Sequence, residues 1–210
     1  MSKNIIIAIF LMMNIGLLYV VKQKNQAGQK LKQLLTTQNA QQANASKTSN
    51  SFIATKYWWE MNSHGSVLPD VSLMSDLSEN QETFSLSELI GDSPKLVFRY
   101  SEIHCDVCVD STLNRIKVFA EEIGKKNILL IASYANPRDM YTFKRLNQID
   151  MPLYNLGQQS LGMAAERADT PYLFMINPDR KVERVYLFYK EIAGHIAGYF
   201  RILRDNYFNV

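Results

Sequence analysis

Cysteine is nearly absent from this sequence, because only Cys105 and Cys108 occur among its 210 residues. Two cysteines are too few for the disulfide-dense scaffolds that stabilise small secreted domains, so the folded protein must depend on a hydrophobic core. Hydrophobic residues make up 47% of the chain, which is enough for a sizeable core. This composition excludes a chain that is disordered throughout.

Strong charge of either sign is also missing. The formal net charge is +3, and the Lys and Arg residues are scattered along the chain. A nucleic-acid-binding surface typically leaves a basic stripe with interleaved aromatic residues, and the sequence contains no such stripe. We therefore expect no nucleic-acid partner.

Charge is absent altogether from residues 5–21, which read IIIAIFLMMNIGLLYVV. As a helix, this segment would be about 25 Å long at ~1.5 Å per residue, just enough to cross a bilayer. A cleaved secretion signal has a shorter apolar run and a small-residue cleavage site, and no such site closely follows Val21. The sequence therefore predicts that residues 1–22 form an uncleaved, single-pass membrane anchor.

Residues 23–51 are rich in Gln, Asn, Ser, Thr and Lys and contain no aromatic residue. This composition predicts a polar linker between the anchor and the folded part of the chain. A short self-associating helix around Leu31, Leu34 and Leu35 is the alternative. The folded domain is then expected at residues 52–210.

Hydrophobic patterning within residues 52–210 changes repeatedly between strand and helix periods. It predicts strands at 95–100, 127–134, 152–156, 172–176 and 182–189, and helices at 107–124, 137–147, 161–167 and 191–207. The last two strands are joined by a tight turn and must be antiparallel. The fold class is therefore α/β, with a mixed sheet flanked by helices.

The two cysteines stand where a buried strand ends and a helix begins. The unpaired N–H groups and the positive dipole end of that helix should stabilise a thiolate at Cys105 and lower its pKa below the ordinary value of about 8.5. Cys108 follows one helical turn later, within bonding distance, and is expected to be less exposed. We expect Cys105 to attack a substrate disulfide and Cys108 to resolve the mixed disulfide.

A metal site is the alternative use of this pair. Zinc normally takes four ligands, and only His64, His104 and His195 are available to complete such a set. We therefore expect no bound metal and no cofactor.

Thr170 and Pro171 immediately precede the expected strand at 172–176. Proline has no N–H to donate to a sheet, so it typically marks the beginning of a strand. An X-Pro bond can be cis at a cost of only ~1 kcal/mol, but by spacing alone an ordinary trans proline is the simpler interpretation.

Together, the strand–C-x-x-C–helix unit, the Thr-Pro before a strand and INPDRKV before the last strand resemble the thioredoxin fold. More closely, the chain resembles the membrane-anchored TlpA-like branch related to the AhpC/TSA superfamily, whose opening is similar to TFSLSELIGDSPKLVFRY. The resemblance covers roughly residues 80–210. It implies a thiol–disulfide oxidoreductase, with Pro171 as a cis-proline beside Cys105 and the backbone of Thr170 pairing with substrate peptide.

The resemblance also implies partners and a location. The substrates would be protein thiols and disulfides, served by an upstream redox partner, and the catalytic domain would face the periplasm from the inner membrane. Only Lys3 precedes the expected span, whereas four lysines follow it: Lys22, Lys24, Lys30 and Lys32. By the positive-inside rule, this distribution favours a domain on the cytoplasmic side. The resemblance nevertheless implies a domain on the periplasmic side, and we expect that orientation.

Departures from the family pattern fall around the cysteines. His104 stands where the family usually has Trp, and Asp106 and Val107 separate the cysteines without a proline. A peroxidase would need Thr or Ser three residues before its reactive cysteine, where this chain has Glu102, so peroxidase activity is not expected.

Four residues are candidates for tuning the thiol pKa. His104 would stabilise the thiolate if protonated, or shuttle a proton if neutral. Arg99 would lower the thiol pKa if it pointed toward the site; otherwise it would lie on the outer sheet face, paired with a carboxylate. Asp106 would raise the thiol pKa, and Glu102 (or Asp110) could accept the proton of Cys108. A thiolate less stabilised than in strong oxidants favours a reductant.

Two further functions remain open. Cys105, Cys108 and a histidine could bind copper in a thioredoxin-fold metallochaperone, or the chain could be a binding module with a vestigial redox pair.

Overall fold

The computed structural model describes residues 22–24, 29–30, 36–37, 51–75, 82–189 and 194–208. The chain divides into two compact units, Met1–Ala54 and Thr55–Val210, and the second unit contains the sheet and the helices that cover it. The apolar segment 5–21, expected to be the anchor, lies outside the described residues. Among the residues that are described, no helix has both the length and the apolar character needed to cross a bilayer.

A mixed seven-stranded sheet with the order β2-β1-β5-β4-β3-β6-β7 forms the centre of the second unit. β3, β4 and β5 run parallel, whereas β6 and β7 are antiparallel to their neighbours, so the expected mixed α/β sheet is confirmed. The strands are β1 Ser72–Ser75, β2 Thr83–Ser85, β3 Lys95–Ser101, β4 Ile128–Ser133, β5 Leu153–Asn155, β6 Tyr172–Ile176 and β7 Val182–Leu187.

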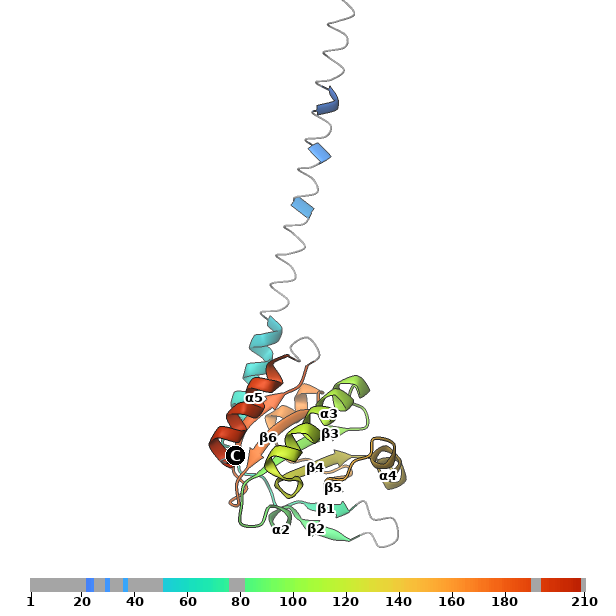
Figure 1. Cartoon of the computed structure of the whole chain (residues 1–210), viewed down its shortest axis with the longest axis vertical. Coiled ribbons are helices and arrows are strands. Elements are labelled where there is room, and N and C mark those ends of the chain that lie inside the picture. Colours follow the sequence, from blue (N-terminus) through green and yellow to red (C-terminus); the bar gives the residue numbers. More distant parts are fainter. Residues whose placement is uncertain are drawn as a thin grey trace, which may run out of the picture. The chain divides into compact units, whose positions relative to one another are not determined.

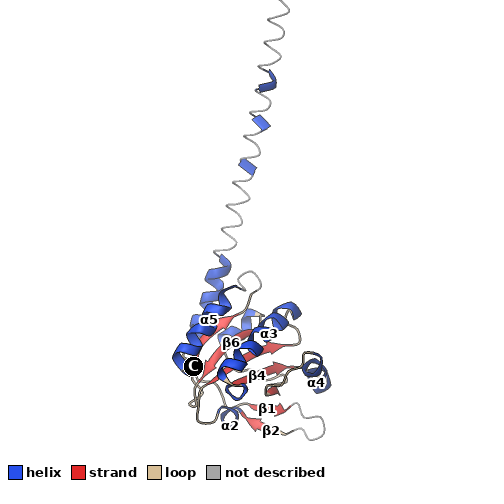
Figure 2. Cartoon of the chain, viewed as in Figure 1, coloured by secondary structure: helices blue, strands red, loops and turns tan. Residues whose placement is uncertain are grey.

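Helices cover the sheet, as Figures 1 and 2 show. They are α2 Leu86–Ile90, α3 Asp106–Ile123, α4 Pro137–Leu146 and α5 Ile196–Leu203, with short 3-10 helices at Lys125–Asn127 and Ala164–Ala168 and a π-helical turn at Arg204–Phe208. A further helix covers residues 51–63.

The two faces of the sheet bury separate hydrophobic clusters. Along β3, Leu96, Phe98 and Tyr100 join the cluster under α3 and α5, and Val97 joins the cluster on the opposite face. This alternation follows from the two-residue period of a strand. It also decides which side chains of β3 can reach the helix that carries the cysteines.

Helix α3 is amphipathic over its 18 residues. Val109, Leu113, Ile116 and Phe119 recur at helical spacing and are buried against the sheet. The helix ends at Gly124, whose φ of 87° is costly for any residue with a side chain. These residues therefore fix the position of the N-terminus of α3 above the end of β3.

Lys56 and Glu60 attach the helix at 51–63 to strand β7. Glu60 Oε1 pairs with Lys56 Nζ and accepts a hydrogen bond of 2.8 Å from the N–H of Leu187. Lys56 Nζ also lies 4.3 Å from the centre of the Tyr186 ring. Burial lowers the pKa of Lys56, and the pairing with Glu60 opposes that shift. The pair is therefore a largely desolvated junction.

Two predicted helices differ in the structure. The segment expected to be helical at 161–167 is a 3-10 helix at Ala164–Ala168. At the C-terminus, α5 begins at Ile196, and residues 191–193 of the expected helix lie outside the described part of the chain. The helix at 51–63 and strand β1 were not predicted.

Candidate dithiol site

Cys105 and Cys108 lie at the beginning of α3. Cys105 is the N-cap residue and is exposed, whereas Cys108 is only 6% exposed. The carbonyl of Cys105 accepts hydrogen bonds from the N–H groups of Cys108 and Val109, at 2.9 and 3.0 Å. The two cysteines approach to 3.1 Å and are not joined by a disulfide. One sulfur is thus accessible at the positive end of the helix dipole, with the second buried beside it.

The loop between β3 and α3 is a tight turn. The N–H of His104 donates to the carbonyl of Ser101 at 3.0 Å, and the N–H of Glu102 donates to the carbonyl of Ser133 at 3.0 Å. The N–H of Ser101 donates to Nδ1 of His104 at 3.2 Å. These bonds hold the residue before Cys105 against the end of the sheet.

His104 is half-buried and neutral in this arrangement. Its Nδ1 accepts a hydrogen bond, which leaves the proton of a neutral imidazole on Nε2. Burial, and then the positive charge of Arg99, lowers the pKa of His104, while Asp169 opposes the shift. Of the two states considered for this residue, the geometry favours the neutral ring over the fixed cation, with Nε2–H available as a hydrogen-bond donor.

We expect a proton titration of the His104 ring, followed by NMR, to give a pKa below 6.5. Because the unfolded chain then binds the proton more readily, stability should fall as the pH drops below about 6.5 toward the folded-state pKa. His104→Asn should remove this part of the pH dependence. A ring that is protonated at pH 7 would contradict the assignment.

Arg99 lies on the sheet face opposite α3 and is buried. Its Nη2 donates to Ser133 Oγ at 2.8 Å and lies 3.7 Å from Glu166 Oε1, and its Nη1 donates to the carbonyl of Tyr100. The structure thus pairs Arg99 with a carboxylate on that face. The charge of Arg99 lowers the pKa of His104, so Arg99 acts on the residue that precedes Cys105.

A cavity of about 280 Å³ opens beside the N-terminus of α3. It is lined by Tyr100, Ser101, Glu102, Asp106, Val109, Tyr134, Asp139, Thr142, Phe143 and Leu146. Three carboxylates and no basic side chain face this space. Asp106 and Glu102 are exposed, and Glu102 Oε1 accepts a hydrogen bond of 3.0 Å from the N–H of Ala135. The cavity next to the first turn of α3 is therefore negative.

Aromatic side chains form the inner wall of this cavity. The rings of Tyr100 and Phe143 lie 5.6 Å apart, and those of Tyr134 and Phe143 lie 6.2 Å apart. Burial, supported by the charges of Glu102 and Asp106, raises the pKa of Tyr134 to about 12. Tyr134 therefore stays protonated at neutral pH.

The prediction of a cis peptide before Pro171 is wrong, because none of the described peptide bonds is cis. Thr170 is buried, and its Oγ1 donates to the carbonyl of Phe188 at 2.5 Å. The N–H of Phe188 donates to the carbonyl of Pro171 at 2.9 Å. These bonds fit an extended chain entering β6, and the trans form of an X-Pro bond is favoured by about 0.5–1 kcal/mol.

No group of three or more His, Cys, Asp or Glu side chains converges on a possible metal position within the described residues. His195 is exposed, one residue before α5.

Asn155 is a site-positioning residue that the sequence did not reveal. It is 1% exposed at the end of β5, and its Oδ1 accepts from the N–H groups of Tyr134 and Gly157, each at 3.0 Å. Its Nδ2 donates to the carbonyl of Tyr134 at 3.1 Å. One amide thus satisfies both backbone groups of a residue that lines the cavity. An isolated Asn in a short strand carries no sequence signal for this role.

We expect Asn155→Ala to lower the free energy of unfolding by about 2–3 kcal/mol, because it leaves buried backbone groups of Tyr134 without partners. Chemical denaturation followed by circular dichroism measures this change. Asn62→Ala is the matched control: Asn62 is exposed and donates to the carbonyl of Trp58, so its loss should cost about 0.5 kcal/mol or less. Equal effects of the two changes would contradict the role given to Asn155.

Comparisons with solved structures show the fold. Peroxidoxin BcpB from Mycobacterium tuberculosis superposes with a TM-score of 0.50 at 18% identity, over 69% of this chain and 97% of that chain. A thiol:disulfide interchange protein from Bacteroides sp. gives a TM-score of 0.49 at 14% identity, over 70% of this chain and 91% of that chain. A secreted thiol-disulfide isomerase from Corynebacterium glutamicum gives 0.49 at 14% identity, over 66% and 86%.

Comparison by sequence gave no match, either to a protein-family model or to a curated protein. The sheet order, the helix that follows β3 and the first of these superpositions together establish a thioredoxin-like fold. At 18% identity, the superposition shows the fold alone.

Proposed function

We propose that this protein is a thiol–disulfide oxidoreductase in which Cys105 is the nucleophile and Cys108 the resolving thiol. One observation carries the proposal: an exposed and a buried cysteine approach to 3.1 Å at the first turn of α3. A sulfur at a helix N-terminus is stabilised as the thiolate, which is the reactive form. The fold shared with peroxidoxin BcpB gives this pair a setting suited to such chemistry.

The reaction proceeds by two exchanges. The Cys105 thiolate attacks one sulfur of a substrate disulfide, the substrate S–S bond breaks, and the released thiolate takes up a proton. Cys108 then loses its proton and attacks Cys105 Sγ, which frees the second substrate thiol and leaves a Cys105–Cys108 disulfide. The substrate gains two electrons and the protein loses two, and an upstream dithiol partner restores the reduced protein.

Side chains near the two cysteines assist the proton transfers. The Nε2–H of neutral His104 donates a hydrogen bond to the leaving substrate thiolate, and water supplies the proton that this thiolate takes up. Glu102 or Asp110 takes the proton of Cys108. Both lie near Tyr134, whose pKa their charges help to raise.

The direction we propose is reduction. The dipole of α3 favours the thiolate, but the carboxylates of Glu102, Asp106 and Asp139 around the adjacent cavity oppose it. A thiolate that is less stabilised makes the reduced form of the protein a stronger electron donor.

Protein disulfides are the proposed substrates, with the backbone at Thr170 and Pro171 beside the substrate peptide. We further propose that residues 5–21 anchor the chain in the inner membrane and that the domain faces the periplasm. The uncharged composition of that segment and the TlpA-like motifs support this placement. Protease protection of the domain in intact spheroplasts would contradict it.

A redox titration tests the proposed function. The full chain is equilibrated in a series of buffers that differ in the ratio of reduced to oxidised dithiothreitol. Its free thiols are then alkylated, and the mass of the product is measured by mass spectrometry. We expect both cysteines to become protected together in one reversible two-electron transition. Loss of alkylation only in the presence of Cu⁺ or Zn²⁺ would instead favour the metallochaperone, and an irreversible or absent transition would favour a binding module.

A further inference from the structure

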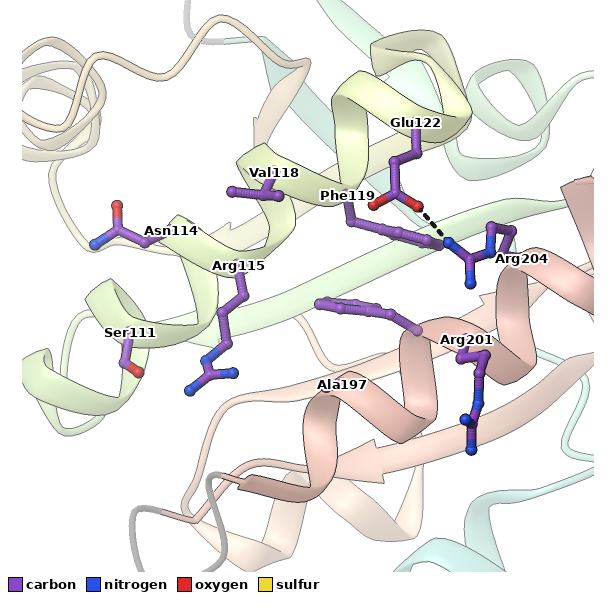
Figure 3. A pocket seen from close by; sticks show the side chains of 10 residues that line it. Ser111, Asn114, Arg115, Val118, Phe119, Glu122, Ala197, Arg201 and Arg204 are labelled. Atoms are coloured by element: carbon purple, nitrogen blue, oxygen red, sulfur yellow. Dashed lines mark hydrogen bonds and ion pairs between the residues drawn. The ribbon is translucent and has the colours of Figure 1, made fainter. Parts of the chain in front are cut away.

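A second and larger hollow lies between α3 and α5, with a cavity volume of about 560 Å³ (Figure 3). Both helices lie on the same face of the sheet and share one hydrophobic cluster. The lining residues are Ser111, Asn114, Arg115, Val118, Phe119 and Glu122 of α3, with Ala197, Phe200 and Arg201 of α5 and Arg204 just after it. None of them belongs to the dithiol site.

The floor of this groove is apolar. The rings of Phe119 and Phe200 stack with centroids 4.5 Å apart and an interplanar angle of 12°. Val118, on the side of α3, is 67% exposed. Phe119 and Phe200 are themselves only 3% and 9% exposed, so the free energy gained when the groove is covered comes chiefly from Val118.

The rim of the groove is positive. Arg115 projects from α3, and Arg201 projects from α5 on the other side (Figure 3). Arg204 is paired with Glu122, at 3.0 Å between Nη1 and Oε2. Within the described part of the chain, Arg115 and Arg201 have no ion pair. Arg204 also lies 3.6 Å from Asp205, between Nε and Oδ1, so three guanidinium groups are opposed by two carboxylates. The remaining positive charge of Arg115 and Arg201 favours an anionic occupant.

The shape of the groove is that of a helix-binding site. On α3, the lining residues Ser111, Arg115, Val118 and Glu122 follow at intervals of four, three and four, so they form one stripe along three turns, about 16 Å at 1.5 Å per residue. Ala197, Arg201 and Arg204 repeat this spacing on the opposite wall. Ridges of a third helix fit a groove of this form between two packed helices.

We propose that this groove binds an acidic amphipathic helix of a partner protein. Apolar side chains at positions i, i+3 or i+4 and i+7 of that helix cover Val118 and the stacked rings, and flanking carboxylates pair with Arg115 and Arg201. An anionic bilayer would meet the arginines but, being flat, would not reach a concave floor. The groove begins three residues after Cys108, so one end of the bound helix lies near the dithiol. The proposal does not depend on redox activity.

Peptide binding to the full chain, reconstituted in nanodiscs of zwitterionic lipid, tests this inference. The probe is a fluorescent 18-residue helical peptide with Leu at i, i+3, i+4 and i+7 positions and Glu on both flanks; its counterpart has Lys in place of Glu. We expect the acidic peptide to bind at micromolar concentration in an anisotropy titration, and the Lys peptide to bind at least 10-fold more weakly.

Charge reversal locates the binding surface. The double change Arg115→Glu and Arg201→Glu should lower the affinity for the acidic peptide at least 10-fold and raise the affinity for the Lys peptide. Arg138→Glu with Arg145→Glu is the matched control, because both residues are exposed on α4, and it should leave both affinities within about 2-fold. All four substituted arginines are exposed, so the fold should tolerate these changes.

Three outcomes would overturn the inference. The first is that the acidic peptide does not bind. The second is that the changes at Arg115 and Arg201 leave its affinity unchanged. The third is that these two arginines bind phosphatidylglycerol vesicles and not the peptide.

Discussion

Replacement of Cys105 by serine should lower the rate of disulfide reduction by about 10³-fold or more. A serine hydroxyl is not ionised at neutral pH, so the exposed N-cap position of α3 would hold no reactive anion. The measurement is the initial rate of reduction of a fluorogenic peptide disulfide by the reduced, purified full chain.

Cys108→Ser is the matched variant for this experiment. It leaves the exposed thiol in place and removes only the buried one, so the first exchange should proceed at a rate within a few-fold of that of the unmodified protein, whereas turnover should stop. A Cys105→Ser variant that keeps most of its activity would contradict the assignment of the nucleophile.

Glu60→Ala should destabilise the folded domain by about 3–5 kcal/mol, which for a domain of this size lowers the melting temperature by about 10 °C or more. The Glu60 side chain is 11% exposed, and its carboxylate both pairs with Lys56 and accepts from the N–H of Leu187. Truncation leaves a buried ammonium group and a strand N–H without their partner. Because burial already lowers the pKa of Lys56, the variant should recover stability as the pH rises and this amine loses its proton.

Glu122→Ala is the control for this loss. Its side chain is 42% exposed and its ion pair with Arg204 faces solvent, so the change should cost about 1 kcal/mol or less when both variants are unfolded in a urea titration. Equal losses for the two glutamates would show that the Lys56–Glu60 junction does not hold the helix at 51–63 to β7.

The hydrophobic pattern of the sequence was sufficient to predict the strands and the helix around the cysteines. β3 and β4 are continuous buried strands, and the apolar residues of α3 recur at helical spacing, so local pattern and tertiary burial agree there. The tight turn before β7 similarly required the antiparallel pair that the structure contains.

Two elements could not be predicted, because tertiary contacts decide them. β1 has only four residues, and pairing with β2 on one side and β5 on the other makes it a strand. In the helix at 51–63, Trp58 is 54% exposed, which conceals the amphipathic pattern. Ser63 and Glu60 fix this helix through bonds to Ala165 and Leu187, more than a hundred residues away along the chain.

The candidate site was only partly visible in the sequence for the same reason. Cys105, His104 and Glu102 are neighbours along the chain, and their proximity follows from the turn that opens α3. Tyr134 and Asp139 lie next to them only because β4 is parallel to β3 and ends at the same edge of the sheet. The cis form of Pro171 was taken from a family pattern, whereas the hydrogen bonds to Phe188 fit a trans chain.

The mixed disulfide between this protein and a substrate most directly tests the claim that Cys105 attacks and Cys108 resolves. The Cys108→Ser chain is incubated with a peptide disulfide, quenched with acid, digested and examined by mass spectrometry. We predict a covalent adduct on Cys105 that persists in this variant, is absent from Cys105→Ser, and clears within one turnover when Cys108 is present. An adduct on Cys108, or none on either cysteine, would contradict the claim.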